Sequence, residues 1–103
     1  MLKINPEPHF TEDIEITIPG KKETGSINLT FKYRTREELK AFWGGKEKKT
    51  DKGLIMGIVT AWDGMDADFN EKNVEIFLNN YPMAGFEIMT AYQKLLLESR
   101  VKN

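Results

Sequence analysis

Hydrophobic and polar residues alternate along two segments near the start of the chain, with the two-residue period of a β-strand. The apolar positions are Ile14, Ile16 and Ile18 in the first segment, and Ile27, Leu29, Phe31 and Tyr33 in the second. Residues 19–25 between them begin with Pro-Gly and end with Gly, which is typical of a turn. The pattern predicts strands over 10–18 and 26–33, paired as an antiparallel β-hairpin.

A helix is expected directly after the hairpin. Thr35 and Glu38 have the spacing of a capping box, in which each side chain accepts a hydrogen bond from the other residue's backbone. Three apolar residues at helical spacing follow and form the expected inner face: Leu39, Phe42 and Trp43. Residues 44–53 contain no apolar side chain, so we expect a solvated loop there.

The nearly continuous apolar segment 54–62 fits either a helix or a buried strand. The spacing of Leu54, Ile58 and Trp62 favours a helix, whereas Gly57 weakens it because glycine lowers helix stability. We expect a helix here, and the strand remains the alternative.

Two further helices are predicted after a turn. Asn70 can cap the first of them, with Phe69 at a hydrophobic-staple position. Its apolar residues recur at helical spacing: Val74, Phe77, Leu78 and Tyr81. Pro82 should end this helix, because proline disfavours helical geometry in the residue before it.

The last predicted helix, residues 83–100, has more apolar residues than one buried face needs. One arc holds seven of them: Ala84, Ile88, Met89, Ala91, Tyr92, Leu95 and Leu96. Phe86 and Leu97 lie outside this arc, about three turns apart on one line of the helix. Either the hairpin or another helix covers them, or they form a docking surface for another chain or a second copy.

These patterns together predict an α+β fold, with an N-terminal antiparallel β-hairpin followed by about four α-helices. The 103 residues fit a single domain spanning 1–103, because neither half could bury a core alone. The segment 1–9 contains two prolines, and we expect it to be flexible.

Composition excludes several classes of protein. Fifteen basic and 16 acidic residues give a net charge of −1, which excludes a strongly basic nucleic-acid coat. Without cysteine there is neither a disulfide framework nor a thiolate metal site. No apolar run is long enough to span a membrane, and the start lacks a signal segment, so we expect a cytoplasmic protein without membrane partners.

The acidic turn after residue 63 resembles an oxygen-ligand metal loop but fails as a calcium site. Aligned from Asp66, Asp68 and Asn70, its sixth position is Glu71 where glycine is required, and its twelfth is Phe77 where a bidentate glutamate is required. We therefore expect a carboxylate-rich turn without a metal.

Nothing in the sequence assembles a catalytic site. His9 is the only histidine and precedes the first strand, and no phosphate-binding glycine motif is present. We expect no catalytic residue, no cofactor and no enzymatic activity.

Four lysines lie close after two aromatic residues and are the strongest argument for nucleic-acid binding: Lys46, Lys48, Lys49 and Lys52. Glu47 and Asp51 interrupt the run, and Phe42 and Trp43 fit the inner face of their own helix. A solvated loop is the favoured interpretation, and a nucleic-acid-binding regulator stays an alternative.

A series of short motifs runs along the chain between residues 12 and 103. In order, they are a strand ending in Pro19-Gly20, 30–39, Ala41-Phe42, 57–63, Asp68-Phe69-Asn70-Glu71, Asn73-Val74, Asn80-Tyr81-Pro82, Ala91-Tyr92 and 100–103. The order and spacing of these motifs resemble those of a family of small phage tail assembly chaperones. Lys72 departs from the pattern, because a second acidic residue is usual there. The resemblance implies a protein of long-tailed phages or prophages that binds the tape-measure protein, keeps it soluble, helps recruit tail-tube subunits and is absent from the mature virion.

On this interpretation, Phe86 and Leu97, with help from Phe77 or Tyr81, line a groove for an amphipathic helix of the tape-measure protein. We expect the other family motif positions to fix the fold: Trp62, Asp63, Phe69, Asn70, Tyr81, Pro82 and Tyr92. Self-association as a homo-oligomer stays open. A structural tail protein, such as a tube or completion subunit, is the main alternative function.

Overall fold

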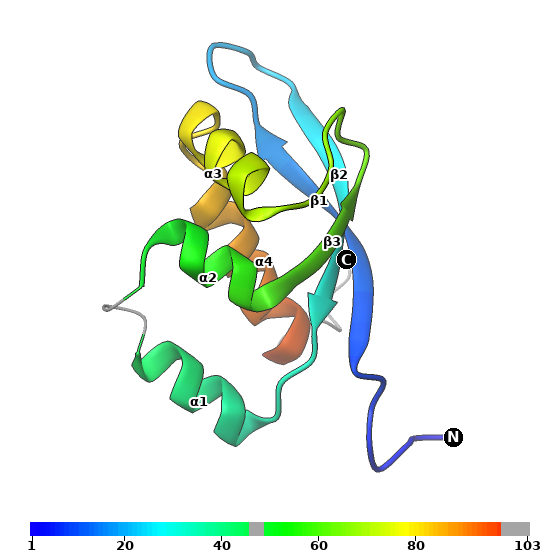
Figure 1. Ribbon diagram of the computed structural model, residues 1–103. Helices are drawn as coiled ribbons and strands as arrows, with labels where there is room; N and C mark the ends of the chain where they lie inside the picture. The colour runs from blue at the N-terminus through cyan, green and yellow to red at the C-terminus, as the bar shows by residue number, and fades with distance from the viewer. Residues whose placement is uncertain (46–48, 98–103) are drawn as a thin grey trace.

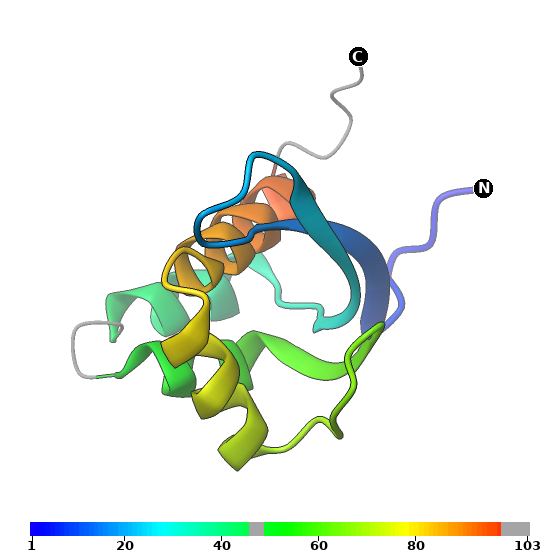
Figure 2. The ribbon, with the colours of Figure 1, turned by 90° about the horizontal axis from the view of Figure 1, so that it is seen from above.

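The computed structural model describes residues 1–45 and 49–97 of the chain. The strands are β1 (His9–Thr17), β2 (Thr24–Lys32) and β3 (Val59–Asp63), and the helices are α1 (Arg36–Gly44), α2 (Asp51–Ile58), α3 (Glu71–Asn80) and α4 (Ala84–Leu97). The strands form an antiparallel sheet with β2 in the middle. Helices α2, α3 and α4 lie on one side of it, and α1 lies at one end of this helical layer (Figure 1; seen from above in Figure 2). The expected α+β fold is confirmed.

The N-terminal hairpin is confirmed, with an unbroken register from His9 opposite Lys32 to Thr17 opposite Thr24. Its inward residues are buried as the alternation predicts: Ile14, Ile16, Ile27, Leu29 and Phe31. The chain turns at Pro19-Gly20, where the Lys21 N–H donates to the Ile18 carbonyl at 3.1 Å. Gly20 has φ = 79°, the left-handed conformation that the third residue of a type II turn requires.

The capping box of α1 is confirmed. The Glu38 N–H donates to Thr35 Oγ1 at 3.1 Å, and the Thr35 N–H donates to Glu38 Oε1 at 2.9 Å. Hydrogen bonding of the Glu38 carboxylate to the backbone N–H and the side chain of Thr35, with smaller contributions from Arg34 and Lys32, lowers the pKa of the Glu38 carboxyl. Leu39 is buried, and Phe42 and Trp43 are half-buried, so the expected inner face of α1 is also confirmed.

The prediction of a helix over residues 54–62 is wrong for residues 59–62, which belong to β3. Helix α2 ends at Ile58, and Val59 is already extended with φ = −114° and ψ = 135°. The β-branched pair Val59 and Thr60 suits a strand, and the free edge of β2 supplies backbone partners that local spacing could not reveal. The hairpin is therefore part of a three-stranded sheet.

The solvated loop expected over residues 44–53 ends earlier in the structure than the sequence predicts. Helix α2 begins at Asp51, because the Thr50 hydroxyl caps it by accepting a hydrogen bond from the Gly53 N–H at 3.0 Å. Residues 46–48 lie outside the described residues.

The last two helices follow their predicted signals. Asn70 caps α3 by accepting a hydrogen bond from the Asn73 N–H at 2.8 Å, and α3 ends at Asn80, two residues before Pro82. Helix α4 begins at Ala84, and residues 98–100 of the predicted helix lie outside the described part of the chain.

The core lies between the sheet and the helical layer, with an aromatic stack at one end. Tyr92 is fully buried and stacks with Phe10 and Phe31 at ring-centroid distances of 6.4 and 5.5 Å. Its hydroxyl donates to the Lys32 carbonyl at 2.6 Å and accepts from Arg34 Nη1 at 3.2 Å. Burial raises the pKa of this hydroxyl. Tyr92 thereby joins α4 to the end of β2.

Candidate docking surface

Two apolar side chains of α4 face away from the core. Phe86 is 62% exposed and Leu97 is 59% exposed, while Ala84, Ile88 and Tyr92 on the opposite side are buried. The first alternative, that the hairpin or another helix covers Phe86 and Leu97, is wrong within the part of the chain that the structure describes. Exposed apolar residues that share one line of a helix are typical of a docking surface.

Phe86 and Leu97 belong to a longer row, which we call the α4 seam. It consists of Met83, which directly precedes α4, and of Phe86, Thr90, Gln93 and Leu97 on α4, with successive spacings of three, four, three and four residues. This spacing is that of the contact positions in a coiled coil, which face a single partner helix. Met83 is 46% exposed, Thr90 is half-buried and Gln93 is exposed. The seam therefore has apolar ends and a polar middle, over about 21 Å of helix.

A hollow of about 460 Å³ lies beside the middle of the seam. Trp43 of α1 forms one wall, and four residues of α4 form the other: Phe86, Met89, Thr90 and Gln93. Side chains of a partner helix on the seam could enter this hollow, as knobs enter holes in coiled coils.

Close contact between α1 and α2 holds Trp43 in place. The Phe42 ring packs over Gly57, and the Arg34 guanidinium lies 4.0 Å from the centre of that ring on a cation–π contact. The Phe42 and Trp43 rings meet edge to face at 5.3 Å. Both aromatic residues thus pack between elements, as expected for the inner face of α1.

The structure does not bring Phe77 and Tyr81 to the α4 seam. Phe77 is only 6% exposed, and it packs against Trp62 and Tyr81 with ring centroids 5.8 and 5.2 Å away. Together with Met65 these two residues line hollows next to the hairpin and the 63–70 turn. The positions of Phe77 and Tyr81 therefore do not support the prediction that they line a groove together with Phe86.

Trp62 anchors the turn that leads from β3 to α3. Its indole Nε1 donates to the Ala67 carbonyl at 2.7 Å, and its ring meets Phe69 edge to face at 5.2 Å. Asp63 Oδ1 accepts from the Gly64 N–H at 2.9 Å, where Gly64 has φ = 93°. These contacts between Trp62, Asp63, Phe69 and their neighbours stabilise the turn itself.

The acidic turn brings no metal-binding group together. Across residues 1–45 and 49–97, no three His, Cys, Asp or Glu side chains are grouped so that they could hold a metal ion. His9 is exposed at the first position of β1.

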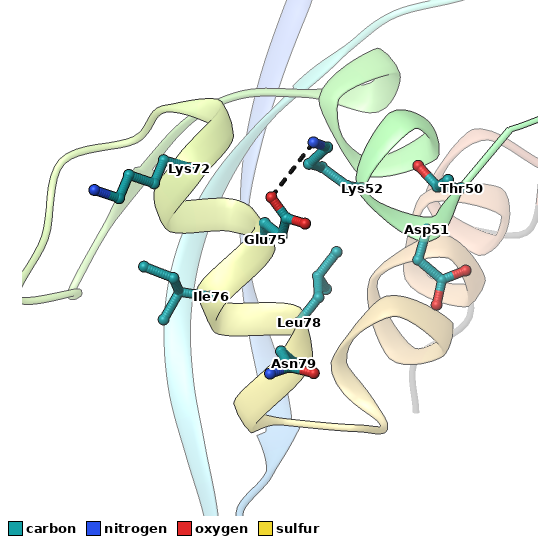
Figure 3. A pocket seen from close by; sticks show the side chains of 8 residues that line it. All are labelled: Thr50, Asp51, Lys52, Lys72, Glu75, Ile76, Leu78 and Asn79. Carbon is teal, nitrogen blue, oxygen red and sulfur yellow. Dashed lines mark hydrogen bonds and ion pairs between the residues drawn. The ribbon is translucent and has the colours of Figure 1, made fainter.

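A second hollow, of about 730 Å³, lies between α2 and α3 and has charged walls (Figure 3). Lys52 Nζ lies 3.5 Å from Glu75 Oε1 and 3.9 Å from Glu71 Oε2, so these carboxylates already pair with its charge. Figure 3 shows Glu75 and Leu78 pointing toward α2, while Lys72 and Ile76 point away from it. Its walls carry both acidic and basic side chains, so the lining favours neither an anion nor a cation.

A comparison with protein families identifies the chain. A family model described as phage tail assembly chaperone matches residues 1–103, the whole sequence. The chain belongs to this family. Tail assembly chaperones are not a known family of enzymes, and their partners are proteins of the growing tail. No curated protein and no solved structure matches this chaperone significantly.

Part of the candidate docking surface was not predicted from the sequence. Phe86 and Leu97 were identified because they fall outside the buried arc, but Met83, Thr90 and Gln93 were not included with them. The alternating spacings of three and four residues could have revealed the whole row. Among the described residues, no helix combines the length and hydropathy needed to cross a membrane.

Proposed function

We propose that this tail assembly chaperone binds the tape-measure protein, keeps it soluble and helps recruit tail-tube subunits around it, without remaining in the mature virion. The observation that supports this proposal is the exposed α4 seam. Its coiled-coil spacing suits one long amphipathic helix, which is the kind of segment that aggregates when its apolar face meets water.

On this proposal, a tape-measure helix lies along α4 with its apolar residues over the two ends of the seam. Phe86 and Leu97 lose their exposure to water on binding, and burying each such side chain contributes about 1.5–3 kcal/mol at most. Thr90 and Gln93 keep the middle polar, which favours one register of the partner helix over others.

The same features favour moderate affinity. A seam with two strongly exposed apolar residues contributes far less binding free energy than an obligate interface does. Immobilising the partner helix offsets part of that free energy. Moderate affinity is what an assembly factor needs, because tube subunits must displace it as the tail grows.

Co-purification with the tape-measure protein tests the proposal. The double variant Phe86→Glu, Leu97→Glu should fold, since both side chains are exposed, and should lose the tape-measure protein from pull-downs. Ile76→Glu is the matched control, because Ile76 is 48% exposed but lies on α3. If the folded double variant retains the partner as well as Ile76→Glu does, the proposed surface is wrong.

Mass spectrometry of purified particles separates the chaperone from the alternative of a structural tail protein. The chaperone should be absent from mature particles and present in assembly intermediates. Stoichiometric presence in finished tails would favour a tube or completion subunit instead.

A further inference from the structure

The outer edge of β1 offers unpaired backbone groups to another strand. In an antiparallel ladder, alternate residues point their N–H and C=O groups toward the neighbouring strand. The Tyr33 N–H donates to the Pro8 carbonyl at 2.9 Å, so even-numbered residues of β1 face β2. Residues 11, 13 and 15 therefore direct their N–H and C=O groups away from the sheet, where no described strand pairs with them.

One of these outward donors already has a partner, which confirms the direction of the others. The backbone N–H of Thr17 donates to Glu87 Oε1 of α4 at 3.0 Å, and the Thr17 hydroxyl donates to the same carboxylate. Glu87 thus pairs with the outward N–H of Thr17, whereas no described strand pairs with the outward backbone groups of residues 11–15.

The open part of the edge runs beside a hollow of about 300 Å³. Residues 13–15 form one wall, and five residues of α4 form the other: Phe86, Glu87, Thr90, Ala91 and Lys94. A strand added to β1 would point alternate side chains into this hollow, against Phe86 and Ala91. Apolar side chains suit those positions.

The charge of the edge decides between possible occupants. Glu12, Asp13 and Glu15 are exposed. On the outer face of the sheet, the Asn28 side chain donates a hydrogen bond to the Asp13 carboxylate, and the Thr24 hydroxyl donates one to the Glu15 carboxylate. A second copy paired through its own β1 would place these carboxylates against each other, which is destabilising. Lysine or arginine on the outward-facing positions of the added strand would be attracted instead.

We propose that β1 accepts an extended segment of a partner protein in which apolar and basic residues alternate. The apolar residues enter the hollow beside Phe86, the basic residues lie next to Asp13 and Glu15, and the backbone bonds to residues 11, 13 and 15. This site takes a strand, whereas the α4 seam takes a helix, so it goes beyond the proposed function.

A synthetic ten-residue peptide of alternating valine and lysine is the probe. It should shift the amide NMR signals of Thr11, Asp13 and Glu15 in the intact chain and slow their hydrogen exchange. A peptide with the same composition in two blocks, five valines and then five lysines, controls for charge attraction alone. Equal binding of both peptides, or no shift at residues 11–15, would overturn the proposal.

Asp13→Pro and Asp13→Ala form a matched pair of variants. Both remove the carboxylate, but only proline removes the outward N–H, and proline is tolerated on an edge strand because this N–H makes no bond to β2. Asp13→Pro should bind the alternating peptide about tenfold more weakly than Asp13→Ala, as expected for a lost backbone hydrogen bond. Equal affinities of two folded variants contradict strand addition.

Two further measurements distinguish strand addition from binding at the α4 seam and from pairing of two copies of the chain. Leu97→Glu should bind the alternating peptide normally while losing the tape-measure protein, so each proposal can fail without the other. Sedimentation of the wild-type chain should show a monomer at concentrations that saturate peptide binding. A dimer that Asp13→Pro dissociates would instead show that a second copy occupies the edge, which overturns the proposed occupant.

Discussion

The ring of Phe42 occupies the space that Gly57 leaves open on α2. A Cβ atom built on Gly57 would lie 2.7 Å from Phe42 Cε1 and 3.1 Å from Cζ. Glycine at this position therefore lets α1 approach α2 and carry Trp43 to the hollow beside the α4 seam.

In Gly57→Ala the aromatic ring must move away from its packed position, which costs about 1–3 kcal/mol. The better helix propensity of alanine offsets about 1 kcal/mol of this cost, so the net destabilisation should be up to about 2 kcal/mol. Chemical denaturation measures the change in the free energy of unfolding. Gly44→Ala is the control, since nothing lies within 4 Å of its added Cβ and it should be neutral or slightly stabilising.

The pair Gly57→Ala and Phe42→Leu tests the reason for this cost. If the clash with the ring is responsible, the double variant should lose less stability than the sum of the two single variants. Additive losses would show that Gly57 matters for another reason.

Tyr92→Phe should destabilise the protein by about 1 kcal/mol. The change keeps the buried ring but removes the hydroxyl that donates to the Lys32 carbonyl and accepts from Arg34. Thermal unfolding monitored by circular dichroism measures the effect. Tyr81→Phe removes a hydroxyl from a half-buried tyrosine and should change the melting temperature less; the opposite order would contradict the role given to Tyr92.

Glu38 should make stability depend on pH in acid. Its pKa is lowered in the folded protein, so the stability it contributes is present above the ordinary glutamate pKa and is lost as the pH falls through the lowered pKa. Between about pH 6 and about pH 3, the wild type should therefore lose more stability than Glu38→Gln.

Urea denaturation at both pH values measures this difference. Glu37→Gln is the control, because Glu37 lies in the same first turn of α1 but takes no part in the capping box. A pH dependence equal in the wild type and Glu38→Gln would show that the capping carboxylate has no such effect.

Local signals predicted most of the fold. The hairpin, the capping box at Thr35 and Glu38, and the Asn70 cap depend on neighbouring residues, and all three were correct. The segment 54–62 was partly wrong because its second half takes its conformation from β2, which lies some 30 residues away in sequence. A continuously apolar segment carries no period that could reveal such a partner.

The candidate site was predictable only where it depended on one helix. Excess apolar residues on the last helix identified Phe86 and Leu97, whose exposure the structure shows. The wall that Trp43 forms and the open edge of β1 depend on how separate elements meet. Phe77 was misplaced for the same reason, since helical spacing alone could not show that Trp62 and Tyr81 bury it.

Site-specific photo-crosslinking tests the central claim, that the α4 seam is the surface that binds the tape-measure protein. A photoreactive amino acid at Gln93, in the exposed middle of the seam, should crosslink to the tape-measure protein during assembly, whereas one at Asn79 on α3 should not. Crosslinks from Asn79 but none from Gln93 would contradict the account.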